Sequence, residues 1–120
     1  MKYYILLISI IFISSCGNKI DKETLTVGSG NDVKVTLKID NNEDIEKVEF
    51  STNCNLIFIN KKEILANKRF IYKFENKGEG TFSTCIYKLG DTICTESYVE
   101  RGYELKLKFE KDSLIFTDFF

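Results

Sequence analysis

Residues 33–39 read VKVTLKI and residues 103–110 read YELKLKFE, and these two stretches decide the fold. In each of them apolar residues take every second place, and charged or hydroxyl residues fill most of the places between. Because side chains alternate between the two faces of a β-strand, this pattern gives each segment one apolar face and one polar, solvent-exposed face. We therefore predict two half-buried strands, Val33–Ile39 and Tyr103–Phe109, in a sheet that is covered on one side.

Weaker forms of the same pattern recur along the chain, separated by turn-forming residues. Phe and Tyr are plentiful, which favours strands. Residues 60–68 (NKKEILANK) allow two interpretations, one helical turn or an irregular crossover. We predict an all-β domain of about eight to nine short strands, arranged as an antiparallel β-sandwich, with a small up-and-down β-barrel as the alternative. The other predicted strands are residues 24–27, 45–51, 55–59, 70–74, 81–89, 92–99 and 114–119.

Two stretches resemble immunoglobulin-like and fibronectin-type domains. The first is VKVTLKIDNNEDIEKVEF (33–50), a strand-loop-strand unit, and the second is YKFENKGEGTFSTCIYK (72–88). In the second, Gly80-Thr81-Phe82 stands where many such domains have Gly-x-Tyr before a late strand. The chain departs from these domains because it has no Trp, places Cys54 beyond the strand that holds the first cysteine of antibody domains, and adds a closing hairpin from Tyr103. The resemblance implies an immunoglobulin-like β-sandwich.

The beginning of the chain has the anatomy of a secretory signal. Lys2 is followed by an apolar run, YYILLISIIFI (3–13), which is too short for a bilayer span of about 20 residues. The run ends in Ile13-Ser14-Ser15-Cys16, which resembles the lipobox of bacterial lipoproteins, with Ile where Leu is usual. The resemblance implies cleavage before Cys16 and a diacylglycerol on its thiol; the alternative is an ordinary signal with a chance cysteine. The predicted segments are a cleaved signal peptide (1–15), a lipidated tether (16–23) and a β-sandwich domain (24–120).

Three further cysteines remain, and in an oxidising compartment at most one internal bridge can form among them. A type II′ turn at Gly90-Asp91 would set Cys85 and Cys94 diagonally across a hairpin. A turn at Leu89-Gly90 would set them directly opposite, close enough for a disulfide. We favour a Cys85–Cys94 bridge. The rival is a bridge from Cys54 to either of them, and three buried reduced thiols are a further alternative.

Charge and composition narrow the classes of function. The formal net charge is −1, with both signs interspersed, and the chain has no His. This charge argues against nucleic-acid binding, and the lack of His removes the commonest general base and the commonest metal ligand. The run DNNED (40–44) fits a solvated turn better than a calcium loop. We therefore expect a protein without enzyme activity, without a metal and without a cofactor.

Leader and composition together predict a lipid-anchored protein on the extracytoplasmic side of a membrane, periplasmic or at the cell surface, with the outer membrane favoured. The expected role is a non-catalytic binding module whose partner is a protein or an envelope component. The alternative role is a small inhibitor or immunity lipoprotein that caps a toxin or a cell-wall hydrolase. Lysozyme-inhibitor lipoproteins resemble this chain in size, β-structure and a disulfide, but their motifs are missing here.

Overall fold

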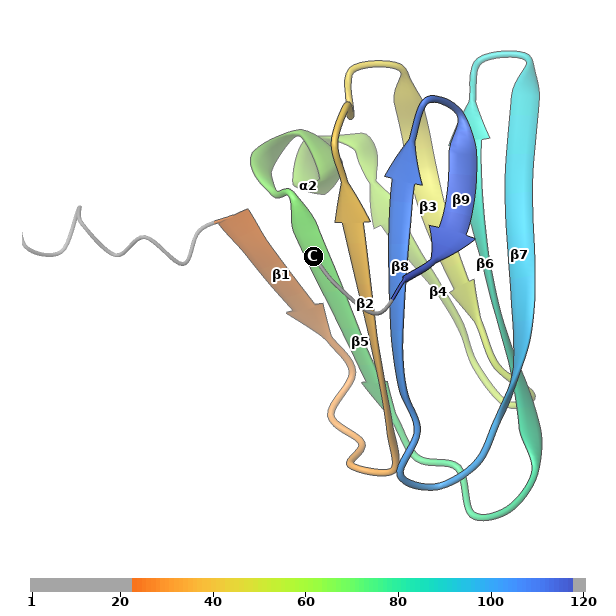
Figure 1. Cartoon of the computed structure of the whole chain (residues 1–120). Coiled ribbons are helices and arrows are strands. Elements are labelled where there is room, and N and C mark those ends of the chain that lie inside the picture. Colours follow the sequence, from red (N-terminus) through yellow and green to blue (C-terminus); the bar gives the residue numbers. More distant parts are fainter. Residues whose placement is uncertain (1–22, 118–120) are drawn as a thin grey trace, which may run out of the picture.

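A computed structural model describes residues 23–117, and its strands form two packed β-sheets (Figure 1). One sheet has the order β1-β5-β2-β8-β9, and the other has the order β4-β3-β6-β7. The predicted all-β sandwich is confirmed, and the described strands do not close into a barrel. The strands are β1 (Thr24–Val27), β2 (Val33–Ile39), β3 (Ile45–Ser51), β4 (Leu56–Asn60), β5 (Arg69–Phe74), β6 (Gly80–Lys88), β7 (Asp91–Val99), β8 (Glu104–Glu110) and β9 (Ser113–Phe116).

The core between the sheets is built from the alternating apolar residues that predicted the strands. Val35 and Leu37 of β2 are fully buried, as are Phe50 of β3 and Phe82 of β6. The ring of Phe50 stacks on that of Tyr72 from the other sheet, with the centroids 5.4 Å apart, and lies 5.8 Å from that of Phe82. Burying one large apolar side chain contributes roughly 1.5–3 kcal/mol. This cluster therefore supplies much of the attraction between the two layers.

Two strand pairs in the five-stranded sheet run parallel, which differs from the fully antiparallel arrangement predicted. β2 pairs in parallel with β8, and β1 pairs in parallel with β5. The parallel pairing of β2 with β8 arises because residues 100–103 cross from the four-stranded sheet to the start of β2. There Lys34 N donates a hydrogen bond to Tyr103 O at 3.1 Å. β8 therefore starts at the same end as β2.

A short helix, α2 (Lys61–Ala66), closes one end of the sandwich. Of the two interpretations of residues 60–68, the helical turn is the one found. The Asn60 side chain accepts a hydrogen bond from Glu63 N at 2.9 Å, and Glu63 Oε1 accepts one from Asn60 N at 3.3 Å. This reciprocal capping box satisfies donors at the helix N-terminus. Ile64 is fully buried in the core and fixes the helix against the sheets.

Of the two candidate turns of the β6–β7 hairpin, the one at Leu89-Gly90 is found. Gly90 has φ 78°, a left-handed conformation that suits glycine at the second central place of a turn. This register sets Cys85 directly opposite Cys94. The two candidate registers differ by two residues and keep the same residues on each face, so the apolar pattern alone does not choose between them.

Candidate binding surface at the loop end of the sandwich

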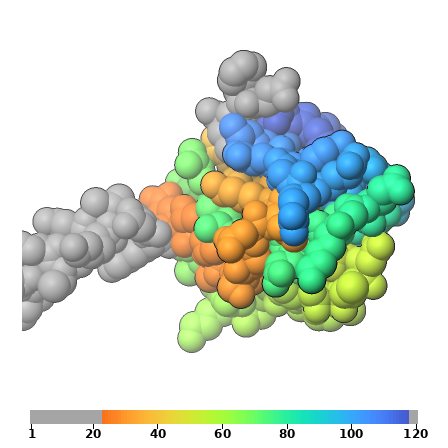
Figure 2. Space-filling model, turned by 90° about the horizontal axis from the view of Figure 1, so that it is seen from below, coloured from red at the N-terminus to blue at the C-terminus, as the bar shows by residue number. Residues whose placement is uncertain are grey.

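The two ends of the sandwich differ in character. One end carries α2 beside the first described strand, where Lys68 N donates to Glu23 O at 2.8 Å. At the other end, four connections come together, as Figure 2 shows from below. We call this surface the loop end. It consists of residues 28–32, 52–55, 75–79 and 100–103.

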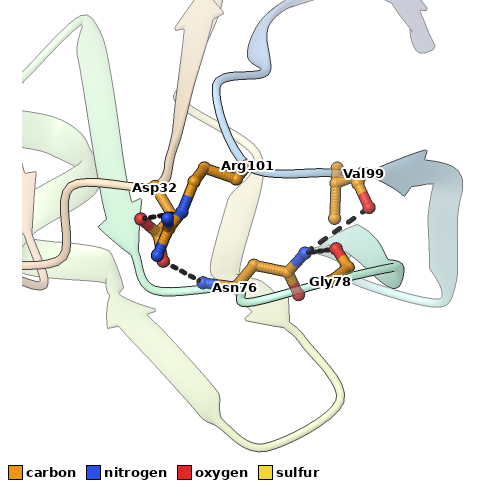
Figure 3. A network of polar contacts seen from close by, with 5 residues as sticks. All are labelled: Asp32, Asn76, Gly78, Val99 and Arg101. Carbon is orange, nitrogen blue, oxygen red and sulfur yellow. Dashed lines mark hydrogen bonds and ion pairs between the residues drawn. The ribbon is translucent and has the colours of Figure 1, made fainter.

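Asp32 ties three of these connections together (Figure 3). Its Oδ1 accepts a hydrogen bond from Arg101 Nε at 3.1 Å, and its Oδ2 accepts one from the backbone N of Asn76 at 2.8 Å. Its backbone O accepts a further hydrogen bond from Gly102 N at 2.6 Å. The Asp32 side chain is 13% exposed and that of Arg101 is 69% exposed. The shielded bond to the backbone therefore contributes more stability than the exposed ion pair.

The side chain of Asn76 extends this network to the end of β7. Its Nδ2 donates to the carbonyl O of Gly78 at 2.6 Å and to that of Val99 at 3.5 Å. Val99 is the last residue of β7 and is fully buried. The β5–β6 connection is thus anchored to the core. Because the loops are cross-linked, a partner would have little conformational entropy to remove from them on binding.

Two exposed tyrosines lie beside the network. The rings of Tyr98 and Tyr103 meet edge to face, with centroids 6.1 Å apart and an interplanar angle of 79°. The Tyr98 hydroxyl donates to Glu79 Oε1 at 3.2 Å. The Glu100 carboxylate, followed by desolvation and by Glu79, raises the pKa of Tyr98, because both carboxylates favour the protonated phenol. The phenol of Tyr98 therefore stays protonated to a higher pH than a free tyrosine.

A hollow of about 310 Å³ opens at the side of the loop end, between β4 and β5. Its walls include Asn55 and Ile57 from one sheet and its loop, and Tyr72 from the other sheet. Tyr72 is 1% exposed, and its hydroxyl has no hydrogen-bond partner within the described part of the chain. Burial raises the pKa of Tyr72, and the nearby Thr52 side chain offsets part of that rise without reaching hydrogen-bond geometry. Such an unpartnered hydroxyl costs stability.

A second surface covers the outer face of the four-stranded sheet. Lys47 Nζ lies 4.7 Å from the ring centroid of Phe58 and 4.6 Å from that of Tyr87, so one cation contacts two aromatic rings. The Tyr87 hydroxyl donates to Glu49 Oε1 at 2.7 Å, and this bond raises the pKa of Tyr87. The polar groups on this part of the face are thus engaged within the chain, while Phe58 stays half exposed.

The four cysteines named from the sequence fall into three groups: two are bridged, one is free, and one lies outside the described residues. Cys85 and Cys94 form a disulfide between neighbouring strands, with Cα atoms 4.0 Å apart, so the favoured pairing is the one in the structure. Cys54 is exposed and free, so the rival pairings through Cys54 are not found. Cys16, the expected lipid site, lies outside the described residues together with the predicted signal peptide. The bridge lies within one sheet, whereas the bridge of antibody domains joins two sheets.

The acidic run 40–44 lies at the α2 end, between β2 and β3. Asn42 Nδ2 donates to Ile64 O at 2.9 Å, so this run binds the helix. Within residues 23–117, no group of three His, Cys, Asp or Glu side chains is placed to hold a metal ion. The same part of the chain contains no helix that is long and apolar enough to span a membrane.

Comparison with protein-family models, curated proteins and solved structures finds no match to this chain. From the sequence, residues 28–32 are only the gap between the predicted strands 24–27 and Val33–Ile39, and the role of Asp32 is not indicated. Its side-chain partners Asn76 and Arg101 lie 44 and 69 positions further along the chain, and a local pattern carries no signal for contacts at such distances.

Proposed function

We propose that the protein is a lipid-anchored, extracytoplasmic binding module that is held at a membrane through Cys16 and presents its loop end to a protein or an envelope component. The role is non-catalytic. The lipobox-like leader supports the anchor. A single acyl chain holds a protein only marginally, so two or three chains on one cysteine would make the attachment long-lived.

The observation that carries the binding role is the cross-linking of the loop end by Asp32. The cross-link fixes Arg101, which lies between Tyr98 and Tyr103 in the sequence. The rings of these two tyrosines contact each other, and Tyr and Arg are enriched among the residues that dominate binding energy. Tyrosine buries a large area with few rotatable bonds, and the planar guanidinium offers several donors at fixed angles. Because Arg101 is largely exposed, a carboxylate or carbonyl oxygen on the partner is the chemistry that fits.

The position of the first described residues supports this orientation. Thr24 pairs with Arg69 at the start of β5, next to α2. Phe74, at the other end of β5, adjoins the loop end, and a six-residue strand spans about 20 Å. A tether that leads from residue 24 towards a membrane would therefore leave from the end opposite the loop end, and the loop end would stay accessible to a partner.

Photo-crosslinking in intact envelopes tests the binding role. A benzoylphenylalanine placed at Tyr103 of the full-length chain should form a discrete adduct with one partner. The same probe at Leu89, which is 90% exposed in the β6–β7 turn at the other end, is the matched control and should not form that adduct. Arg101→Ala should reduce the adduct formed from position 103. Equal crosslinking from both positions, or none from position 103, would exclude the loop end as the binding surface.

A further inference from the structure

β4 is an unguarded edge of the four-stranded sheet. Among the described strands it pairs only with β3. Its sequence, LIFIN, carries no charge and no Pro, and Leu56 and Phe58 are 56% and 50% exposed. Natural sheets protect their edges with very short strands, Pro or charges, because free N–H and C=O groups attract other strands. The other edges follow that rule: β1 and β9 have four residues each, and β7 carries the exposed Glu96.

The disulfide shows which way the backbone groups of the four-stranded sheet point. The 4.0 Å separation between the Cα atoms of Cys85 and Cys94 is that of a non-hydrogen-bonded pair. Because bonding alternates along an antiparallel ladder, Cys85 directs its N–H and C=O groups towards β3, where it is paired with Glu49. The residues on either side of Glu49, Val48 and Phe50, must then direct theirs towards β4.

The same alternation fixes the free groups of β4. Val48 pairs with Ile59 and Phe50 pairs with Ile57, so these two isoleucines make the bonds to β3. The N–H and C=O groups of Leu56 and Phe58 are therefore directed at the open edge. A strand that docks there would receive main-chain hydrogen bonds at alternate residues, as in β-strand addition.

We propose that β4 pairs antiparallel with β4 of a second copy of this chain, across a twofold axis that passes between the two Phe58 residues. Each Phe58 N–H then donates to the Phe58 carbonyl O of the other copy. Leu56 lies opposite Asn60 and Ile57 lies opposite Ile59. The two four-stranded sheets become one continuous sheet, and the contact is complete after two copies because it is isologous.

The side chains of β4 suit a second copy because no charge meets a charge in this pairing. The two Phe58 rings come side by side on the outer face, where aromatic cross-strand pairs are favourable. Lys47 contacts Phe58 from β3, one strand back from the edge. The backbones of the two lysines are then three strand spacings apart, about 14 Å, and each ammonium stays over the rings of Phe58 and Tyr87 in its own copy. The contact is made by the β4 edge along the side of the sandwich, and neither Asp32 nor Arg101 takes part in it.

Sedimentation equilibrium of the full chain in density-matched detergent reports the protein mass and tests this pairing. The wild type should show a monomer–dimer equilibrium that depends on concentration. Phe58→Glu and Phe58→Lys each place like charges opposite one another at the axis, and each should weaken association roughly tenfold or more. An equimolar mixture of these two variants should dimerise again, because opposite charges then meet. Ile115→Glu on β9, where Ile115 is 44% exposed, is the matched control and should not change association.

Hydrogen exchange on the wild type gives a readout that needs no substitution. The amides of Leu56 and Phe58 should become protected as the concentration rises, while exchange along β9 stays constant. A chain that stays monomeric up to its solubility limit overturns the proposal. So does a dimer that Phe58→Glu and Ile115→Glu weaken equally, or one that forms without added protection in β4.

Discussion

Asp32 and Arg101 stand 69 positions apart in the sequence, yet Arg101 Nε donates a hydrogen bond to Asp32 Oδ1 at 3.1 Å. This contact joins the β1–β2 connection to the crossing by which the chain leaves β7 for β8. The crossing is held at a second point, because Gly102 N donates to the Asp32 carbonyl O. The residue that shapes the loop end therefore also positions the start of β8, and with it the parallel pairing with β2.

Replacing Asp32 by Ala is expected to lower the free energy of unfolding by about 1–3 kcal/mol, because the shielded N–H of Asn76 loses its acceptor. Arg101→Ala removes only an exposed ion pair and should cost less than about 1 kcal/mol. Urea unfolding of the two full-length variants measures the difference. Equal losses would mean that the ion pair, and not the bond to the backbone, carries the contact.

Replacing both Cys85 and Cys94 by Ser is expected to destabilise the fold by roughly 2–3 kcal/mol, since the bridge closes a short ring with a sequence separation of 9. Denaturant unfolding of the oxidised wild type and the double variant measures this loss. Cys54→Ser is the control, because Cys54 is exposed and unbonded, and it should leave stability nearly unchanged. A large loss from Cys54→Ser together with a small loss from the double variant would place the bridge elsewhere.

Tyr72→Phe is expected to be neutral or to stabilise the fold by up to about 1 kcal/mol. The substitution keeps the ring stacked on Phe50 and removes a buried hydroxyl that has no partner within the described residues. Phe50→Ala, which empties the same cluster, should instead cost about 3–5 kcal/mol. Thermal unfolding of both variants is the measurement. A loss of more than about 1 kcal/mol in Tyr72→Phe would mean that the hydroxyl has a bonding partner.

Stability is expected to fall as the pH rises above about 10. Glu100 raises the pKa of Tyr98, Glu49 raises that of Tyr87, and Asp112 raises that of Lys88, from ordinary values of 10.0, 10.0 and 10.5. A raised pKa in the folded state means that folding binds these protons more tightly. The stabilisation is therefore complete below the unfolded pKa values and is lost as the pH climbs through the folded ones.

Denaturation midpoints measured from neutral pH upwards test this dependence. The midpoint should stay level until about pH 10 and then decrease. Tyr98→Phe should make the decrease shallower, because it removes one of the groups that release a proton on unfolding. A midpoint that rises above pH 10, or a decrease that is equally steep in Tyr98→Phe, would contradict the linkage to Tyr98.

Local patterns were enough to predict most of the fold. The strands Val33–Ile39 and Ile45–Ser51 have the bounds expected from their alternation, because one face of each is buried against the same core. The gap between the predicted strands Tyr103–Phe109 and 114–119 contains the β8–β9 turn, where Lys111 and Asp112 both take positive φ values. In these places the backbone and burial preferences of neighbouring residues agree, so the sequence nearby holds sufficient information.

Features that depend on distant partners could not be predicted in the same way. The parallel pairing of β2 and β8 follows from a crossing whose geometry is set by Asp32, far away in the sequence. The Leu89-Gly90 and Gly90-Asp91 turns place the same residues on each face of the hairpin, so the apolar pattern does not distinguish between them. Asp32 lies among the Gly, Ser and Asn residues of 28–32, which are common in turns, so its local sequence does not indicate a structural role for its carboxylate. Its role depends on a backbone N–H that the fold brings from position 76.

The central claim, attachment through Cys16, is tested most directly by growing cells that make the full-length chain in radiolabelled palmitate. The wild-type protein should carry label and be recovered in the membrane fraction, and Cys16→Ala should lose both. Cys54→Ser serves as the matched control and should keep both. A wild-type chain that takes up no label and is recovered free of membranes would contradict the account.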